Sequence, residues 1–337
     1  MSGQAYVEPK AAWSVSLEGK DLTATMAPRL ISLTLSERRN ESADELEVIL
    51  HDHDGKLALP PLGAVLTVAL GWERGTGVTI GLAEKGSFKV DEMTWDGPPD
   101  KVTIRARSAD MAGTFRKRKS RTWHGKTIGA IVRQIAADNG LTPRCHADLA
   151  GVVVTSAEQP NKSDMQFLRD LGRRYDAVAT IKNKSLIFSP INATTTATGR
   201  PIAAVALTKS DGDQYRYERS SREDGQDGAE AQWHDQGSSK RQTAKEGGSN
   251  RRRLKRVYSS EGDAKAAARA ENNRLKRAGA TMEVSKAFGD ASITAGMSAT
   301  ATGFKAEIDK QSWKIASVRH TFDDSGFRTE LEMEVAG

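Results

Sequence analysis

The sequence predicts a mainly β fold with an α+β insertion, in which two related β domains flank a small α+β module. The strongest indication is an internal repeat, because the end of the chain echoes its beginning. Ser87–Trp95 (SFKVDEMTW) is matched by Ser312–His320 (SWKIASVRH), and the glycine-bounded run Gly63–Trp72 by Gly296–Phe304. A repeat of this kind indicates two copies of one structural unit. Two similar units in each chain allow an oligomer to present twice as many quasi-equivalent positions as it has subunits.

The first zone, residues 1–108, has the period of β-strands. Leu30–Leu35 and Val102–Ala106 alternate apolar and polar side chains, and Glu45–Leu50 does so until its last two positions. Half-buried antiparallel strands of this kind are typical of a barrel or a sandwich. His51–Gly55 contains side chains that can ligate a metal, but Asp-Gly between two apolar runs is first of all a turn signal. We therefore predict a turn here and no metal site.

The middle zone, residues 109–192, changes to a helical period. Thr127–Asn139 places apolar residues at helical spacing, and Gly140 supplies a stop signal. A second helix begins at Ser163, where the sequence Ser-Asp-Met-Gln fits a capping box. Val178–Phe188 follows as a hairpin, so the zone is predicted to be a small α+β module.

The last zone, residues 193–337, returns to the β period, with a helix expected from Asp263 to about Arg277. It is interrupted by a polar, glycine-rich insertion at residues 219–256. That composition offers little apolar surface to bury, so it predicts an exposed loop or a locally disordered excursion.

A run of cations in this insertion provides the candidate partner-facing residues. They are Arg251, Arg252, Arg253, Lys255 and Arg256. Such a run can attract nucleic-acid phosphates or an acidic protein through screened electrostatic forces. The alternative is a solvated loop whose charge is neutralised by the upstream acids Glu223, Asp224, Asp227 and Glu230.

Composition restricts the chemistry that the chain can carry. Its 337 residues are too many for one ordinary core and indicate two or three domains. The single cysteine, Cys145, excludes an internal disulfide and a cysteine-based zinc cluster. No apolar run approaches the roughly 20 residues of a membrane helix. Met1–Trp13 lacks a signal-peptide pattern, so we expect a protein that begins in a cytoplasm and contacts no membrane. The net charge of +6 tolerates an anionic partner without requiring one.

Five short motifs, in this order and at this spacing, resemble one known family. They are Asp52–Gly55 (DHDG), Pro60–Gly63 (PPLG), Gly86–Asp91 (GSFKVD), Thr127–Ala136 (TIGAIVRQIA) and Ser163–Leu171 (SDMQFLRDL). The chain is similar to the phage late control D family, the tail hub proteins of P2-like contractile phages, which are related to the N-terminal part of type VI secretion spike proteins. The insertion at 219–256 is where the chain departs most from the family.

The resemblance implies a structural tail hub protein of a contractile phage or phage-like particle. It implies a homotrimer with two tube-type β-barrels per subunit, at residues 1–108 and 193–337. Three chains would present six similar barrels, which can match the six-fold tail tube on one side and the three-fold spike on the other. The implied partners are the chain itself, the tail spike protein, the tail tube ring, the tape measure protein, other baseplate proteins and DNA in transit through the channel. The protein would be located in the virion tail baseplate after assembly in the host cytoplasm.

Two other classes of function stay open at this point. A cell-wall-binding or cell-wall-degrading tail enzyme would need paired acids or a nucleophile, and no such motif is present. Glu330, Glu332 and Glu334 alternate with apolar residues, which is typical of an exposed strand face rather than of catalytic acids. A DNA-binding late-gene regulator would fit the basic run, but the sequence has no recognition-helix pattern. We therefore predict no catalytic residues, no cofactor and no bound metal.

Overall fold

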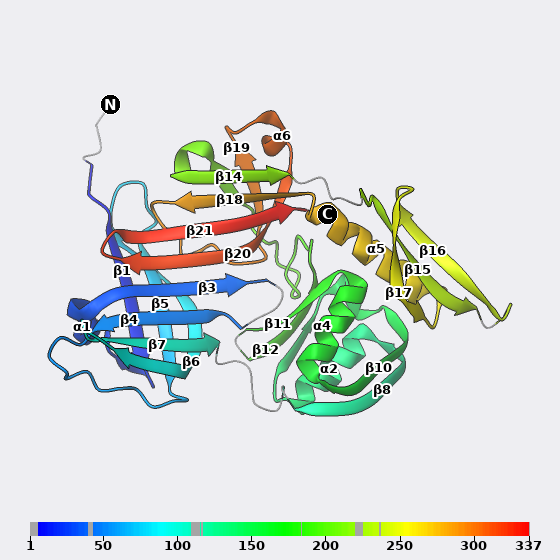
Figure 1. The fold of residues 1–337 in the computed structure, drawn as a ribbon, viewed down its shortest axis with the longest axis horizontal. Coiled ribbons are helices and arrows are strands. Elements are labelled where there is room, and N and C mark those ends of the chain that lie inside the picture. The colour runs from blue at the N-terminus through cyan, green and yellow to red at the C-terminus, as the bar shows by residue number, and fades with distance from the viewer. Residues whose placement is uncertain are drawn as a thin grey trace.

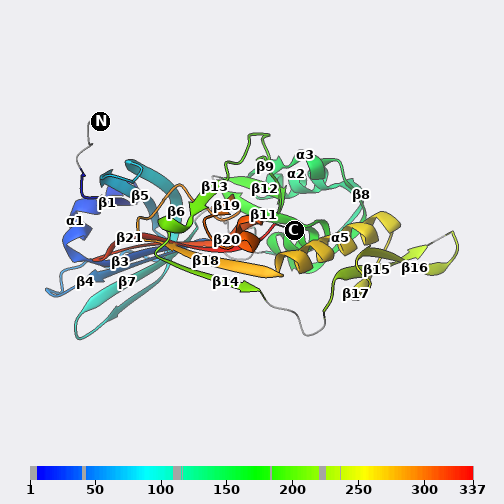
Figure 2. The ribbon, with the colours of Figure 1, turned by 90° about the horizontal axis from the view of Figure 1, so that it is seen from above.

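The structure, a computed structural model, describes residues 6–39, 43–108, 115, 117–182, 184–219, 225–235 and 237–336. It is mainly β, as predicted. Figure 1 shows a long sheet on one side of the molecule, a compact α+β module beside it, and a small separate sheet at the far end of the long axis. Figure 2 confirms that the small sheet and the N-terminal strands lie at opposite ends.

One sheet of 13 strands joins the first and last parts of the chain. Its hydrogen-bonded order is β14-β18-β21-β20-β3-β4-β7-β6-β5-β1-β2, and β19 pairs with both β20 and β13. The strands are β1 (Lys10–Leu17), β2 (Lys20–Asp21), β3 (Leu30–Arg38), β4 (Glu45–His51), β5 (Val65–Arg74), β6 (Gly81–Asp96), β7 (Lys101–Ser108), β13 (Val205–Thr208), β14 (Gln214–Arg219), β18 (Ala280–Lys286), β19 (Ser298–Thr302), β20 (Ser312–Asp323) and β21 (Gly326–Val335). Its short helical elements are α1 (Thr23–Met26), η1 (Ala27–Arg29), η3 (Lys209–Asp211) and α6 (Ala306–Asp309).

The long sheet consists of two halves with the same strand order. In the N-terminal half-sheet the order is β1-β5-β6-β7-β4-β3, and in the C-terminal half-sheet it is β13-β19-β20-β21-β18-β14. Numbered along the chain, both read 1-4-5-6-3-2. They differ in one pairing, since β1 and β5 are antiparallel whereas β13 and β19 are parallel. The segments matched in sequence occupy corresponding strands, β5 with β19 and β6 with β20.

The expected closed barrels are not observed in the single chain. Within the described residues the strand pairs form an open path rather than a ring. In a closed barrel, the last strand of each half-sheet would pair with its first strand. Among the described residues β14, the last strand of the C-terminal half-sheet, pairs only with β18. β3, at the edge of the N-terminal half-sheet, pairs with β20 instead of with β1. The predicted mainly β architecture is correct, whereas the two closed barrels are not confirmed.

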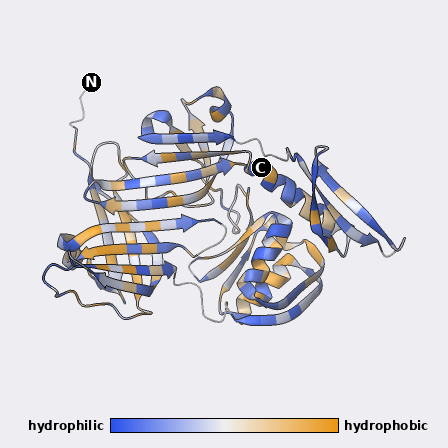
Figure 3. Cartoon of the chain, viewed as in Figure 1, coloured by the Kyte–Doolittle hydropathy of each residue, from blue (hydrophilic) through white to orange (hydrophobic). Residues whose placement is uncertain are grey.

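Each half-sheet buries one face. The N-terminal core includes Leu33, Leu35 and Val48, and the C-terminal core includes Ile315 and Met333. The matched aromatics Phe88 and Trp313 are both buried, each with 1% of its surface exposed. The strands of both halves alternate in hydropathy along their length (Figure 3). This alternation is the period-two signal that predicted the strands.

A buried polar cluster fastens the two halves together. β20 pairs with β3 over seven residues, from Ser317 opposite Arg38 to Asp323 opposite Ser32. Beneath this seam the Lys85 ammonium lies 2.8 Å from the Glu37 carboxylate, and both side chains are almost fully buried. Lys85 also donates to the backbone carbonyl of Ala291 at 3.0 Å. A buried ion pair stabilises the fold only when the other polar atoms of both side chains are also hydrogen-bonded. For the Lys85 ammonium this condition is met.

The middle module has its own core. It contains β8 (Arg118–Thr127), α2 (Ile128–Asp138), β9 (Thr142–Cys145), α3 (Ala147–Ala150), β10 (Val153–Ser163), α4 (Asp164–Tyr175), β11 (Ala177–Lys182) and β12 (Ser185–Pro190). Both predicted helices and the predicted hairpin are confirmed. Thr127 and Ser163 are the N-caps, accepting from the backbone N–H of Ala130 and Gln166 at 3.2 Å each. The side chains of α2 and α4 pack against β11 and β12 in one cluster.

The insertion at 219–256 was predicted to be an exposed loop, and this prediction is wrong. Apart from residues 220–224 and 236, which are outside the described residues, it folds into β15 (Gly228–Asp235), β16 (Lys240–Gly247) and β17 (Arg251–Tyr258), in the order β16-β15-β17. The predicted helix follows as α5 (Glu261–Arg277) and packs on this sheet. The core is small because it is built mainly of alanine: Ala231, Ala244, Ala264 and Ala268. Figure 3 shows these three strands as largely hydrophilic.

Helix α5 anchors the insertion to the middle module through polar contacts. The Tyr175 hydroxyl donates to the Asp263 carboxylate at 2.6 Å. Arg277 and Asn273 both donate to Asp176 at 3.0 Å. These contacts replace the apolar surface that the insertion lacks.

Trp313 tests whether the second half-sheet has a core of its own. Its indole N–H donates to the Ile308 carbonyl at 3.3 Å and its ring meets that of Tyr217 edge-on. Trp313→Ala should lower the free energy of unfolding by about 3–5 kcal/mol, since it leaves a large cavity. Leu62→Ala is the control: this side chain is 67% exposed, so its loss should cost less than about 1 kcal/mol. Urea denaturation of both variants measures the difference, and equal costs would contradict the buried position.

His320 makes the seam sensitive to acid. Its ring is fully buried, with Nδ1 2.9 Å from the Thr329 hydroxyl and Nε2 3.2 Å from the Ile293 carbonyl. Burial lowers the pKa of His320 to about 4, from an ordinary value of 6.5. The unfolded chain therefore takes up a proton first as the pH falls. Stability from this group is complete above pH 6.5 and is lost between pH 6.5 and 4, by up to about 3 kcal/mol.

Urea denaturation at pH 7 and pH 4.5 checks this, with His320→Gln as the variant that cannot titrate. The wild-type chain should lose more stability between the two pH values than His320→Gln does. His124→Gln, at an exposed position, should behave like the wild type. The same pH dependence in His320→Gln and the wild type would contradict the assignment.

Candidate functional site

The acidic side chains of the segment His51–Gly55 make hydrogen bonds and an ion pair that hold a turn. Arg29 binds Asp54 in a two-pronged contact, with N–O distances of 2.8 and 2.7 Å. Its hydrogen bonds hold the pKa of Asp54 well below the usual range. Asp52 is buried and accepts hydrogen bonds from the backbone N–H of Leu57 at 3.0 Å and the Trp95 indole at 3.2 Å. This segment forms the predicted turn, and the described residues contain no group of three or more potential metal ligands.

Cys145 is not equipped to act as a nucleophile. It lies half-buried in β9. Burial raises the pKa of its thiol to about 11, so the thiol is protonated near neutral pH.

Among the described residues no helix is long and apolar enough to cross a membrane.

The face of the long sheet opposite the cores is charged and hollowed. Two hollows, of about 590 and 380 Å³, lie along it. Their charged lining includes Glu45, Glu47, Asp91, Glu92, Glu283, Glu330 and Glu332, with Arg105, Arg107, Arg216 and Arg319. Arg105 binds Glu47 at 2.8 Å and Glu92 at 3.0 Å, so neighbouring strands are linked by ion pairs. The predicted exposed strand face containing Glu330 and Glu332 is part of this surface.

The structure divides the five candidate basic residues between two faces of the small sheet. Successive side chains of a strand point to opposite faces. Arg251, Arg253 and Lys255 therefore share the outer face of β17, where Arg253 binds Glu230 at 2.6 Å. Arg252 and Arg256 point to the α5 side: Arg252 lies 3.2 Å from Glu271, and Arg256 lies over the Tyr258 ring. The sequence could not make this division because it predicted no strand here.

The outer face of the small sheet has a neutral centre and a basic border. The strand registers place Thr243, Gln232 and Val257 in one row across the three strands. Cations from β16 and β17 surround this row: Arg241, Lys245, Arg251, Arg253 and Lys255. Of the upstream acids proposed to neutralise the run, Glu230 lies on this face, Asp227 accepts from the Asn250 N–H, and Glu223 and Asp224 are outside the described residues.

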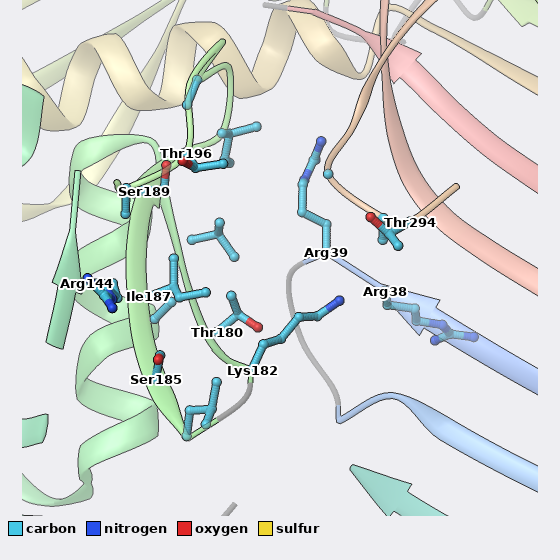
Figure 4. A pocket seen from close by; sticks show the side chains of 18 of the residues that line it. Arg38, Arg39, Arg144, Thr180, Lys182, Ser185, Ile187, Ser189, Thr196 and Thr294 are labelled. Atoms are coloured by element: carbon cyan, nitrogen blue, oxygen red, sulfur yellow. The ribbon is translucent and has the colours of Figure 1, made fainter. Parts of the chain in front are cut away.

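A cleft of about 580 Å³ separates the middle module from the long sheet. Figure 4 shows Thr180, Lys182 and Ile187 on the module wall and Arg38, Arg39 and Thr294 on the opposite wall. Among the described residues, the lining includes the cations Arg39, Arg144, Arg169 and Lys182 and one carboxylate, that of Asp44. Arg39 is ion-paired with Glu334, and the Arg38 side chain points away from the cleft (Figure 4). Sequence reasoning missed this cleft because its walls come from segments far apart in the chain.

The chain is similar to known proteins in sequence and in fold. The chain is 35% identical to the "Probable baseplate hub protein" of Escherichia phage P2, over 96% of its own length and 92% of the relative's. Its fold is that of a 43 kDa tail protein from prophage MuSo2 of Shewanella oneidensis, with a TM-score of 0.67, 13% identity and coverage of 96% and 98% of the two chains. It also resembles c3393, a component of the E. coli type VI secretion system, with a TM-score of 0.58, 10% identity and coverage of 96% and 77%.

The fold and the relatives define a structural protein of a phage tail. Residues 43–326 match the family described as phage tail baseplate hub (GPD), and the chain belongs to this family. The resemblance to late control D hub proteins is thereby confirmed. The family is structural, so the alternative of a cell-wall enzyme is rejected.

Proposed function

We propose that three copies of this hub protein surround an axis and adapt a six-fold tail tube to a three-fold spike. The observation that carries the proposal is the repeated strand order 1-4-5-6-3-2 in two half-sheets joined edge to edge. Three such chains present six similar units on one side of a ring while the whole keeps three-fold symmetry. The half-sheets are then the tube-type domains, and subunit contacts complete what the open sheet leaves unclosed.

The open edges of the long sheet support a ring. The sheet ends in β14 on one side, which pairs only with β18 among the described strands. On the other side it ends in β1, whose outer edge pairs with β2 over only two residues. Exposed strand edges invite uncontrolled association unless they are covered. Neighbouring subunits around a ring would cover both edges.

The charged face of the long sheet is proposed to line the channel. Carboxylates outnumber guanidinium groups among its lining residues. A wall of this charge repels DNA phosphates, so it lets DNA pass without holding it. The apolar faces are already buried in the two cores, which leaves this face as the one available to water in a channel.

The basic outer face of the small sheet is proposed to contact a neighbouring tail protein. The candidates are the spike, the tube ring, the tape measure protein and other baseplate proteins. A neutral centre with charges around it is the composition of a protein interface. Arg251, Arg253 and Lys255 would face an acidic surface of this neighbour. Arg252 instead links the sheet to Glu271 of α5, and Arg256 lies over the Tyr258 ring of its own strand.

The oligomeric state tests the main proposal. Light scattering should give three times the chain mass of 36.5 kDa for the protein alone, or, if the trimer forms only with the spike protein, a complex whose mass is three hub chains plus the bound spike. The physical reason is that two half-sheets per chain need three chains to present six units. A protein that stays monomeric or dimeric with the spike present would refute the adaptor.

Charge removal tests the basic face. The triple variant Arg251→Ala, Arg253→Ala, Lys255→Ala should assemble into baseplates at least about tenfold less efficiently, because its loss of charge weakens docking. Its melting temperature should stay within a few degrees of wild type, since Arg253 and Lys255 are exposed and Arg251 is only half-buried. The control Lys20→Ala, Lys56→Ala, Lys305→Ala removes the same charge at exposed positions elsewhere. Normal assembly and infectivity of the first variant would leave the basic face as a solvated surface only.

A further inference from the structure

The cleft between the middle module and the long sheet runs along an open strand edge. β11 pairs with β12 on one side and with no other described strand. Five consecutive residues of β11, Val178 to Lys182, line the cleft. β12 contributes the alternate residues Ser185, Ile187 and Ser189, with Pro190 at its end. Alternate residues line a cavity through one face of a sheet, whereas consecutive residues line it through the edge as well.

The hairpin register shows which backbone groups this edge offers. Two residues separate Lys182 from Ser185, its partner in the register. The pair that flanks a two-residue turn is hydrogen-bonded, so Lys182, Thr180 and Val178 bond to β12. The N–H and C=O groups of Ile181 and Ala179 then point away from β12, toward the cleft. No hydrogen bond from another described residue meets them.

The charges around the edge favour an anion. Lys182 reaches into the cleft, and among the described residues its ion-pair partner is Asp44, at 3.9 Å. Behind the wall lies Lys314, whose buried ammonium donates to the carbonyl of Ala193 at 3.0 Å. Burial lowers the pKa of Lys314, and the nearby Arg39 lowers it further. A lowered pKa disfavours the charged form of Lys314, so the positive wall of the cleft is that of the module, with Lys182, Arg144 and Arg169.

The side chains of a strand added to β11 would meet different residues on the two faces of the sheet. An added strand would place alternate side chains on the two faces of the sheet. On one face they would lie beside Thr180 and Lys182, and on the other beside Met165 and Arg169 of α4. The apolar part of the lining, Val178, Ile187, Ile191 and Ile202, accommodates aliphatic side chains.

We propose that this cleft binds an extended, acidic segment of a partner protein, which adds to β11 as a fourth strand of the β9–β12–β11 sheet. Unpaired backbone groups in an edge strand are matched by another peptide backbone. Nucleic-acid phosphates can accept from the Ala179 and Ile181 amides, but they offer no alternating donors for the carbonyls of the same residues. The cations select acidic side chains on the added strand. This binding site is independent of the trimer, because all of its walls belong to one chain.

Amide hydrogen exchange resolved to single residues tests the proposal on the full-length protein. The probe is an acetylated eight-residue peptide that alternates valine and glutamate, and the comparison probe has lysine in place of glutamate. The acidic peptide should slow exchange at Ala179 and Ile181 by at least about tenfold. Val178 and Thr180 are the internal control, because their amides are protected by β12 with or without the peptide.

Two variants identify the cause. Lys182→Glu with Arg144→Glu should weaken peptide binding at least about tenfold in fluorescence anisotropy, as repulsion replaces attraction. Ala179→Pro removes one amide that faces the cleft and should abolish binding, whereas Lys20→Glu with Lys56→Glu, at exposed positions elsewhere, should not. If Ala179→Pro fails to fold, the charge variant and the exchange data still show whether the acidic peptide binds along β11. The proposal is overturned if the acidic peptide protects neither amide, or if the lysine peptide or a single-stranded oligonucleotide binds equally well.

Discussion

The pairing of β3 with β20 is the contact on which the architecture depends. It turns two half-sheets into one surface, and the groups beneath it commit the chain to this arrangement. The Trp72 indole crosses the seam to donate to the Gly289 carbonyl at 2.7 Å, and Phe327 of β21 packs in the N-terminal core. Gly289 lies so close to the Phe327 ring that a Cβ would be 2.8 Å from it. Removing one partner of the buried Lys85–Glu37 pair would leave a charge without compensation, so the two halves cannot separate without a large cost in free energy.

Charge differs from one surface of the fold to another. The long sheet carries an acid-rich face, whereas the cleft and the outer face of the small sheet carry an excess of cations. The protein therefore does not present one uniform field to its surroundings despite its net charge of +6. A surface that must let DNA pass and surfaces that must hold acidic partners need opposite potentials, and separate elements of the fold supply them.

The sequence predicted the parts of the fold that depend on period and on caps. Alternation identified the strands around Leu33 and Ile104, and the Ser163 cap located α4. The repeat matched β5 with β19 and β6 with β20, but it could not show that β3 would pair with β20, since register between distant strands leaves no local signal. The small sheet was missed because its buried positions hold alanines such as Ala231, whose hydropathy is too weak to stand out among charges. The basic run was recognised, yet only the strand register separates Arg251 from Arg252.

The central claim is that two half-sheets of one chain act as equivalent units around an axis. A three-dimensional reconstruction of the assembled hub by electron cryomicroscopy, bound to its tail tube, measures this most directly. The account predicts three chains whose six half-sheets lie at the same radius, with Glu47, Arg105 and Glu330 facing the channel. Half-sheets at two different radii, or this charged face turned outward, would contradict it.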